Sequence, residues 1–180
     1  MSAVIPDNLK AEGLHLFQRG LYDQALTKFE AAVHAYAADG DETGRAEMLN
    51  NLGVIYRLRG DRQAALAALS EAETIFSRVG DPNRQAQTLG NLGDLYAAGR
   101  NKQEAARCYS DAAALFAQVG DPLKQSQVLR ALSLMRLRQG QWLEAMVRME
   151  ESLRVRPRIS LPQRLFRALL RFALGLLGFR

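Results

Sequence analysis

The amino-acid sequence predicts an all-α protein, built as a solenoid of four helix-turn-helix repeats followed by one amphipathic helix. Three observations predict this class. A pattern of leucine, glycine and tyrosine recurs at a fixed period. Glycine and aspartate, which are typical of turns, occur at matching places in each period. Alanine and leucine are abundant, while residues that favour β-strands are few. Because alanine and leucine favour helix, the segments between these turns are expected to be helical.

The recurring pattern reads Leu-x-x-Leu-Gly-x-x-Tyr at Leu49–Tyr56 and again at Leu89–Tyr96, forty residues later. Weaker copies lie at Leu9–Leu16 and Leu129–Arg136. Later in each unit, a small residue, a large apolar residue and a second small residue occupy matching columns. These columns hold Ala25, Phe29 and Ala32; Ala65, Leu69 and Ala72; Ala105, Tyr109 and Ala112; and Ala145, Met149 and Ser152. Such self-similarity at one period is the signature of a repeat array.

Turn residues set the expected helix ends. Glycine adopts the left-handed conformation that ends a helix, aspartate caps the next helix, and proline fits its first turn. These turns lie at 39–41, 79–82 and 119–122 between units, and at 19–20, 59–61, 99–101 and 139–140 within units. The segments between them predict eight helices, at about 7–19, 22–38, 42–58, 61–78, 82–98, 101–118, 122–138 and 141–155.

These helices pair into four units, at about 6–39, 40–79, 80–119 and 120–157. Gly53 and Gly93 are expected where the two helices of a unit approach closely, with large neighbours such as Leu69 and Tyr109 filling the space around them. A unit of this kind cannot bury its apolar face alone, so neighbouring units are expected to stack.

The last segment, 158–180, is expected to form a basic amphipathic helix over Gln163–Phe179. Seven arginines and no acid lie from Arg154 to Arg180, and subtracting them from the net charge of +5 leaves −2 for the preceding residues. The apolar run is too short and too charged to span a bilayer comfortably. One interpretation is a cap over the apolar face of helix 141–155. A second is a contact with an anionic membrane surface, and a third is docking to another protein or self-association. The expected tail contacts are Arg164, Arg167 and Arg171.

The combined pattern, Leu-x-x-Leu-Gly-x-x-Tyr followed by Ala-x-x-x-Phe-x-x-Ala, resembles the tetratricopeptide repeat over about residues 6–157. In that family each unit is a pair of antiparallel helices, and the usual period is about 34 residues. The longer period here is similar to that of the repeats in kinesin light chain and in a mitotic-spindle adaptor that binds extended peptides. The resemblance implies a right-handed α-α superhelix with a concave groove.

The resemblance also implies a partner-binding surface on that concave face, which the first helix of each unit lines. The matching positions are Lys10, Phe17, Glu47, Asn50, Asn51, Arg57, Gln87, Asn91, Asp94, Gln127, Arg130 and Arg138. In peptide-binding relatives, an asparagine in the column of Asn51 and Asn91 holds the backbone of an extended ligand. An amide suits that role because it both donates and accepts hydrogen bonds. The alternative is that these two asparagines only bond to neighbouring helices.

No group of residues indicates catalysis, a metal site or a cofactor. His15 and His34 are isolated histidines without other ligands at metal-binding spacing. Cys108 lies three residues after Ala105 on the packed side of its helix, so we expect a buried or half-buried small side chain. No phosphate loop, dinucleotide fingerprint or nucleophile elbow is present. The expected groove carries both signs of charge, whereas nucleic acid requires a sustained basic stripe.

The sequence therefore predicts a non-catalytic adaptor or scaffold that binds a peptide or helix of a partner protein in its groove. The alternative is a membrane-peripheral scaffold or assembly factor that docks to a membrane, or to a membrane-protein complex, through the basic C-terminal helix. The start of the chain, Met1–Asp7, lacks the basic region and apolar run of a secretory signal. With the single cysteine, this favours a cytoplasmic location, at the membrane periphery in the alternative case.

Overall fold

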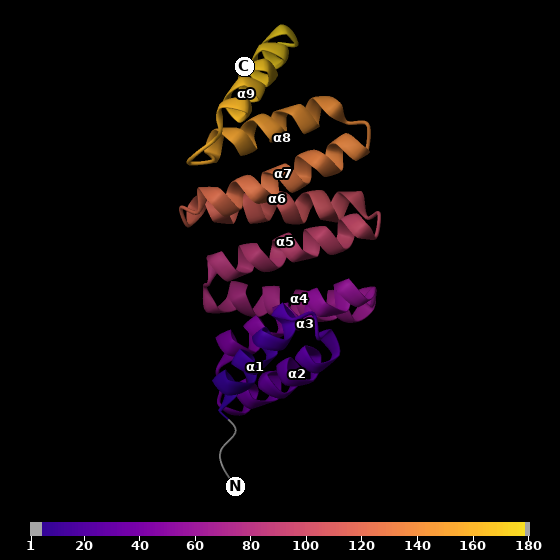
Figure 1. Ribbon diagram of the computed structural model, residues 1–180, viewed down its shortest axis with the longest axis vertical. Helices are drawn as coiled ribbons and strands as arrows, with labels where there is room; N and C mark the ends of the chain where they lie inside the picture. The colour runs from indigo at the N-terminus through magenta and orange to yellow at the C-terminus, as the bar shows by residue number, and fades with distance from the viewer. Residues whose placement is uncertain (1–4, 179–180) are drawn as a thin grey trace. The chain divides into compact units, whose positions relative to one another are not determined.

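The computed structural model describes residues 5–178, and within that range the chain forms nine helices and no strand (Figure 1). The helices are α1 (Pro6–Gln18), α2 (Tyr22–Ala38), α3 (Glu42–Arg59), α4 (Arg62–Val79), α5 (Pro82–Ala98), α6 (Lys102–Gln118), α7 (Pro122–Arg138), α8 (Trp142–Val155) and α9 (Leu161–Leu176). The first eight agree with the sequence prediction to within one residue at each end. The all-α class and the array of paired helices are thus confirmed.

The last helix differs in its bounds from the expected Gln163–Phe179. It begins two residues earlier because Ser160 and Gln163 form a reciprocal capping box around the first turn, with Pro162 inside it. Gly178 follows its end with φ 82°, a conformation that terminates helices. Phe179 and Arg180, like Met1 to Val4, lie outside the described residues.

The expected aspartate and asparagine caps are present at the helix starts. Asp41, Asp61, Asn101 and Asp121 each accept a hydrogen bond from a backbone N–H three residues later, over distances of 2.8 to 3.4 Å. Asp81 does the same for the N–H of Arg84 at 2.9 Å. Each such cap satisfies a donor that the first helical turn would otherwise leave unpaired.

One turn departs from the glycine pattern. Gly20, Gly60 and Gly140 are left-handed in the turns between the helices of their units, but the matching residue of the third unit is Arg100, with φ 60°. The sequence suggested Gly99 for this role, yet the helix continues to Ala98 and the left-handed residue comes one position later. A side chain in this conformation clashes with its own backbone, which costs about 1–2 kcal/mol.

Replacing Arg100 with glycine is therefore expected to raise the free energy of unfolding by about 1 kcal/mol. The relief of backbone strain stabilises the folded state, and this outweighs the destabilising effect of the greater unfolded-state entropy of glycine. Urea unfolding followed by circular dichroism measures the change. Arg62→Gly, inside the first turn of α4, is the matched control and should lower the same quantity by up to about 1 kcal/mol. An Arg100→Gly protein that is less stable than the parent would show that the backbone strain is compensated elsewhere.

Gly13 and Gly53 lie at close crossings between the two helices of their units. A Cβ placed on Gly13 would lie 2.5 Å from Cε1 of Phe29, and one placed on Gly53 would lie 2.5 Å from Cγ of Leu69 and 3.4 Å from the carbonyl oxygen of Ala65. Carbon atoms in contact are normally about 3.5–4 Å apart. These positions therefore hold glycine because the opposing large residue occupies the space of a side chain.

The chain divides into two compact units, one ending at Leu95 and the other beginning at Tyr96. In the first unit α1 to α4 pack in chain order, and the core is built from fully buried side chains that include Phe29, Met48 and Ile55. In the second unit α6 to α9 pack in chain order. Cys108 is buried there, as its place on the packed side of α6 predicted.

Helix α9 packs against α8. Leu170 and Leu174 are buried in that contact, and Arg167 Nε lies 3.1 Å from Glu150 Oε1. Among residues 5–178, no helix has the length and apolar character needed to cross a membrane.

Candidate partner-binding pocket

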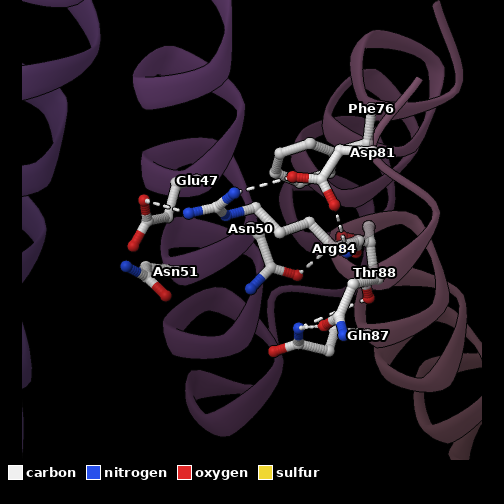
Figure 2. A pocket seen from close by; sticks show the side chains of 9 residues that line it. Glu47, Asn50, Asn51, Phe76, Asp81, Arg84, Gln87 and Thr88 are labelled. Carbon is white, nitrogen blue, oxygen red and sulfur yellow. Dashed lines mark hydrogen bonds and ion pairs between the residues drawn. The ribbon is translucent and has the colours of Figure 1, made fainter. Parts of the chain in front are cut away.

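A polar pocket of about 460 Å³ lies in the first compact unit (Figure 2). Helix α3 supplies one wall, helix α5 supplies the other, and the end of α4 with its following turn closes one side. The lining residues are Glu47, Asn50, Asn51, Phe76, Asp81, Asn83, Arg84, Gln87 and Thr88. This volume is within the usual range for ligand pockets, although most of those are largely apolar.

Helical spacing brings each wall together. Glu47, Asn50 and Asn51 are three and four residues apart on α3, and side chains at that spacing share one side of a helix. Arg84, Gln87 and Thr88 repeat the same spacing on α5. Asp81, whose side chain caps α5, also faces this space, so the cap that begins the helix contributes to the pocket.

Asn50 is fixed in place by the opposite wall. Its Oδ1 accepts hydrogen bonds from Asn91 Nδ2 at 2.9 Å and from Thr88 Oγ1 at 3.2 Å. Thr88 is fully buried, and Asn91 is half-buried. Asn91 therefore bonds to a neighbouring helix. This is one of the two alternatives that the sequence analysis gave for it, and ligand contact is the other.

Asn51 is in a different situation from Asn91. Its half-buried side chain lines the pocket, and no side chain or backbone group among residues 5–178 hydrogen-bonds to its amide (Figure 2). The Nδ2 of Asn50 likewise has no acceptor within that range. Both amides therefore present polar groups to whatever occupies the pocket.

The charged groups around the pocket are mutually paired. Arg84 donates to Asp81 Oδ2 at 2.6 Å, and Glu47 lies 2.8 Å from Lys10 Nζ and 3.9 Å from Arg84. Burial alone would raise the pKa of Asp81, but hydrogen bonds from the backbone and guanidinium of Arg84 bring it below its usual value. The hydrogen bond to Asp81 raises the pKa of Arg84. The pocket thus holds both signs of charge, fixed within it.

The remaining predicted residues are distributed as follows. Lys10 touches the pocket only through Glu47, and Arg57 lies 3.9 Å from Asp94 between α3 and α5. Phe17 is half-buried against the core of the first unit, with its ring centroid 5.6 Å from that of Tyr22. On α7, in the second unit, three predicted residues are exposed: Gln127, Arg130 and Arg138. Of the predicted residues, the pocket itself brings together Glu47, Asn50, Asn51 and Gln87.

The sequence did not single out Asp81, Asn83, Arg84 or Thr88 as pocket residues. Asp81 was interpreted only as a helix cap, a role that the structure confirms. The usable signal was the spacing of Arg84 and Thr88 relative to Gln87, which places all three on one side of α5. Within residues 5–178, no group of histidine, cysteine and acidic side chains has the arrangement of a metal site.

The tetratricopeptide repeat model matches residues 9–78 and 44–118, which together make up more than half of the chain. The chain belongs to the tetratricopeptide repeat family. Repeats of this family generally serve as protein-protein interaction scaffolds, and the fold is typically non-catalytic. No curated protein matches the sequence.

Solved tetratricopeptide repeat structures share the fold. The chain is similar to BtubC (BKLC) from P. vanneervenii, with a TM-score of 0.74 and 25% identity, covering 89% of this chain and 71% of that one. It is also similar to a Podospora anserina protein described as kinesin light chain-like with nearly identical TPR-like repeats. There the TM-score is 0.74 and the identity 20%, covering 98% of this chain and 90% of that one. The resemblance to tetratricopeptide repeats of the kinesin light chain kind is confirmed for the fold.

Proposed function

We propose that this tetratricopeptide repeat protein is an adaptor that holds an extended segment of a partner protein in the pocket between α3 and α5. The observation that carries the proposal is the Asn51 side chain, which lines the pocket without a hydrogen-bond partner among the described residues. An amide left in that state loses its hydrogen bonds to water when a ligand covers it. A peptide backbone can replace the bonds that the amide donates and those that it accepts, because it offers one donor and one acceptor per residue.

The bonds around Asn50 support the same ligand class. Thr88 and Asn91 hold its Oδ1, so its Nδ2 is already directed before a ligand arrives. Pre-ordered polar groups reduce the entropy lost on binding. The pocket is lined mainly by polar side chains, with Phe76 as its one aromatic residue. This composition favours a polar segment of a protein over an apolar small molecule.

The paired charges indicate the side chains that the segment carries. Glu47 is shared between Lys10 and Arg84, and Arg84 is shared between Glu47 and Asp81. In a ligand with both an acidic and a basic side chain, the acid can pair with a basic residue of the pocket and the base with an acidic one. No charge is then left uncompensated. A ligand of one sign would leave one of the pocket's own groups unpaired, which is costly in a partly buried site.

Asn51→Ala is the direct test, because the substitution removes no hydrogen bond within the described protein. The free energy of unfolding should stay within about 0.5 kcal/mol of the parent, while affinity for the partner segment should fall about tenfold or more. The tagged full chain is used to recover partners from native extract, and recovered proteins are quantified by mass spectrometry. Asn8→Ala, an exposed asparagine of α1 outside the pocket, is the matched control.

Asn91→Ala separates ligand contact from helix bonding. It removes the bond to Asn50 Oδ1 and should lower the free energy of unfolding by about 1 kcal/mol. Partner recovery that is equal for the parent, Asn51→Ala and Asn8→Ala proteins would contradict the assignment of this pocket.

A further inference from the structure

Helix α9 uses only one of its sides to pack on α8. Leu170 and Leu174 are each 7% exposed, while Gln163 and Arg167 beside them are half-buried. The ion pair between Arg167 and Glu150 lies on this same side and fixes the rotation of α9 about its own axis. The orientation of the opposite side is thereby determined.

The opposite side of α9 is a continuous row of large apolar residues. Leu165, Leu169, Phe172 and Leu176 follow one another at helical spacing, and their exposed fractions are 60%, 66%, 69% and 74%. We name these four residues the free apolar face. Single exposed apolar residues are ordinary, but a contiguous row of this size marks a contact with a protein or a membrane.

The apolar surface continues onto α8. A second pocket, of about 710 Å³, lies where the end of α9 meets the start of α8. Its apolar lining comes from Trp142, Leu143, Met146, Val147 and Leu177. The Trp142 side chain is 70% exposed. Tryptophan is enriched at the boundary between lipid and water because its ring is amphipathic.

The charged side chains of α9 itself have one sign, and Glu144, which lines the second pocket on α8, is ion-paired with Arg136 at 3.1 Å. Arg164 and Arg171 are exposed on the side of α9 that lies between the contact with α8 and the free apolar face. Residues 154–178 contain no aspartate or glutamate, and the side chain of Glu150 is paired with Arg167. The free apolar face is therefore flanked by arginines that no acid of this segment neutralises.

We propose that the free apolar face and its flanking arginines attach the protein to the surface of an anionic lipid bilayer. The helix lies in the plane of the interface, the four apolar side chains enter the boundary of the acyl region, and Arg164 and Arg171 contact lipid phosphates. This attachment is separate from the pocket between α3 and α5.

Charge complementarity selects the bilayer over a second copy of the chain. Pairing two free apolar faces would bring Arg164 and Arg171 of both copies together, with no acid in residues 154–178 to offset the repulsion. An anionic bilayer buries the same apolar side chains and supplies opposite charge. Juxtamembrane arginines and lysines each strengthen binding to such a surface several-fold.

The test is co-sedimentation of the full chain with vesicles of phosphatidylcholine alone and of phosphatidylcholine mixed with phosphatidylserine. We expect the protein to pellet with the mixed vesicles and to remain largely soluble with the neutral ones. Leu169→Asp/Phe172→Asp should weaken partitioning on the order of 100-fold. Arg164→Gln/Arg171→Gln should weaken it roughly 10- to 30-fold. All four positions are exposed, so folding should be retained, and circular dichroism checks this.

Two controls match these variants. Val79→Asp/Leu123→Asp places the same charges on exposed apolar residues outside α9, and Arg19→Gln/Arg62→Gln removes the same charge from exposed sites in the first unit. Both should pellet like the parent. Equal pelleting with neutral and anionic vesicles, or no pelleting with either, overturns the proposal. A dimer by light scattering that Leu169→Asp/Phe172→Asp dissociates also overturns it, in favour of self-association.

Discussion

Replacing Phe29 with alanine is expected to lower the free energy of unfolding by about 3–5 kcal/mol. The Phe29 side chain is fully buried, and it fills the crossing between α1 and α2 against Gly13. Truncation removes its transfer free energy and leaves a cavity, because close-packed helices relax only in part. Urea unfolding monitored by circular dichroism measures the loss. Phe172→Ala, which truncates a phenylalanine that is 69% exposed, is the control and should change stability by less than about 0.5 kcal/mol.

The partnership between Phe29 and Gly13 makes this prediction sharper. Gly13→Ala alone should destabilise the protein by about 1–3 kcal/mol, since its Cβ would lie 2.5 Å from Cε1 of Phe29. In Gly13→Ala/Phe29→Ala the new methyl group enters the space that the ring has left. The double variant should therefore lose less stability than the sum of the two single variants, by at least about 1 kcal/mol. Additive losses would mean that the two positions do not share one packing site.

Replacing Gly53 with valine is expected to destabilise the protein by at least about 3 kcal/mol. Even a single Cβ there would lie 2.5 Å from Cγ of Leu69 and 3.4 Å from the backbone oxygen of Ala65. The side chain of Leu69 can shift, but the backbone of α4 cannot do so without separating the two helices of the unit. Overpacking of this kind costs about 1–3 kcal/mol for small additions, and valine adds a branched group at the closest point of the crossing.

Gly175→Ala provides the contrasting case for Gly53. Gly175 also lies within a helix, yet a Cβ placed on it would meet no atom within 4 Å. Alanine should there stabilise α9 by up to about 1 kcal/mol, through helix propensity alone. Thermal unfolding of Gly53→Val and Gly175→Ala, each compared with the parent, measures the two changes in stability. If Gly53→Val were as stable as the parent, the glycine column would have no steric role.

Local chemistry explains why the sequence predicted the helix boundaries so closely. A helix ends where a left-handed residue follows it and begins where a side chain caps it, and both signals lie within a few residues of the boundary. The expectation that glycine takes the left-handed position was wrong in the third unit, where Arg100 and not Gly99 has a positive φ. The early start of α9 at Leu161 depends on the cap at Ser160, which the sequence prediction of a helix from Gln163 did not include.

The pocket was less accessible to prediction because it depends on contacts between helices far apart in the sequence. Asn50 and Asn91 are separated by 41 positions, and the column alone did not show that Asn91 turns toward Asn50. Nor did it show that Asn51 has no such partner among residues 5–178. The repeat register gives the side of a helix on which a residue lies, whereas hydrogen-bond pairing depends on rotamers across the crossing. Ligand contact at the predicted groove positions stays a prediction.

A photo-reactive amino acid introduced at Gln87 tests the central claim most directly. Gln87 is exposed at the wall of the pocket, and within residues 5–178 its side chain hydrogen-bonds only to Asn83 of the same helix. After irradiation in native extract, we expect discrete covalent adducts with a partner protein, and we expect them to weaken when Asn51→Ala is added. The same amino acid at Asn8 should give none of these adducts. Adducts that are identical at both positions, or that persist unchanged with Asn51→Ala, would contradict the pocket as the binding site.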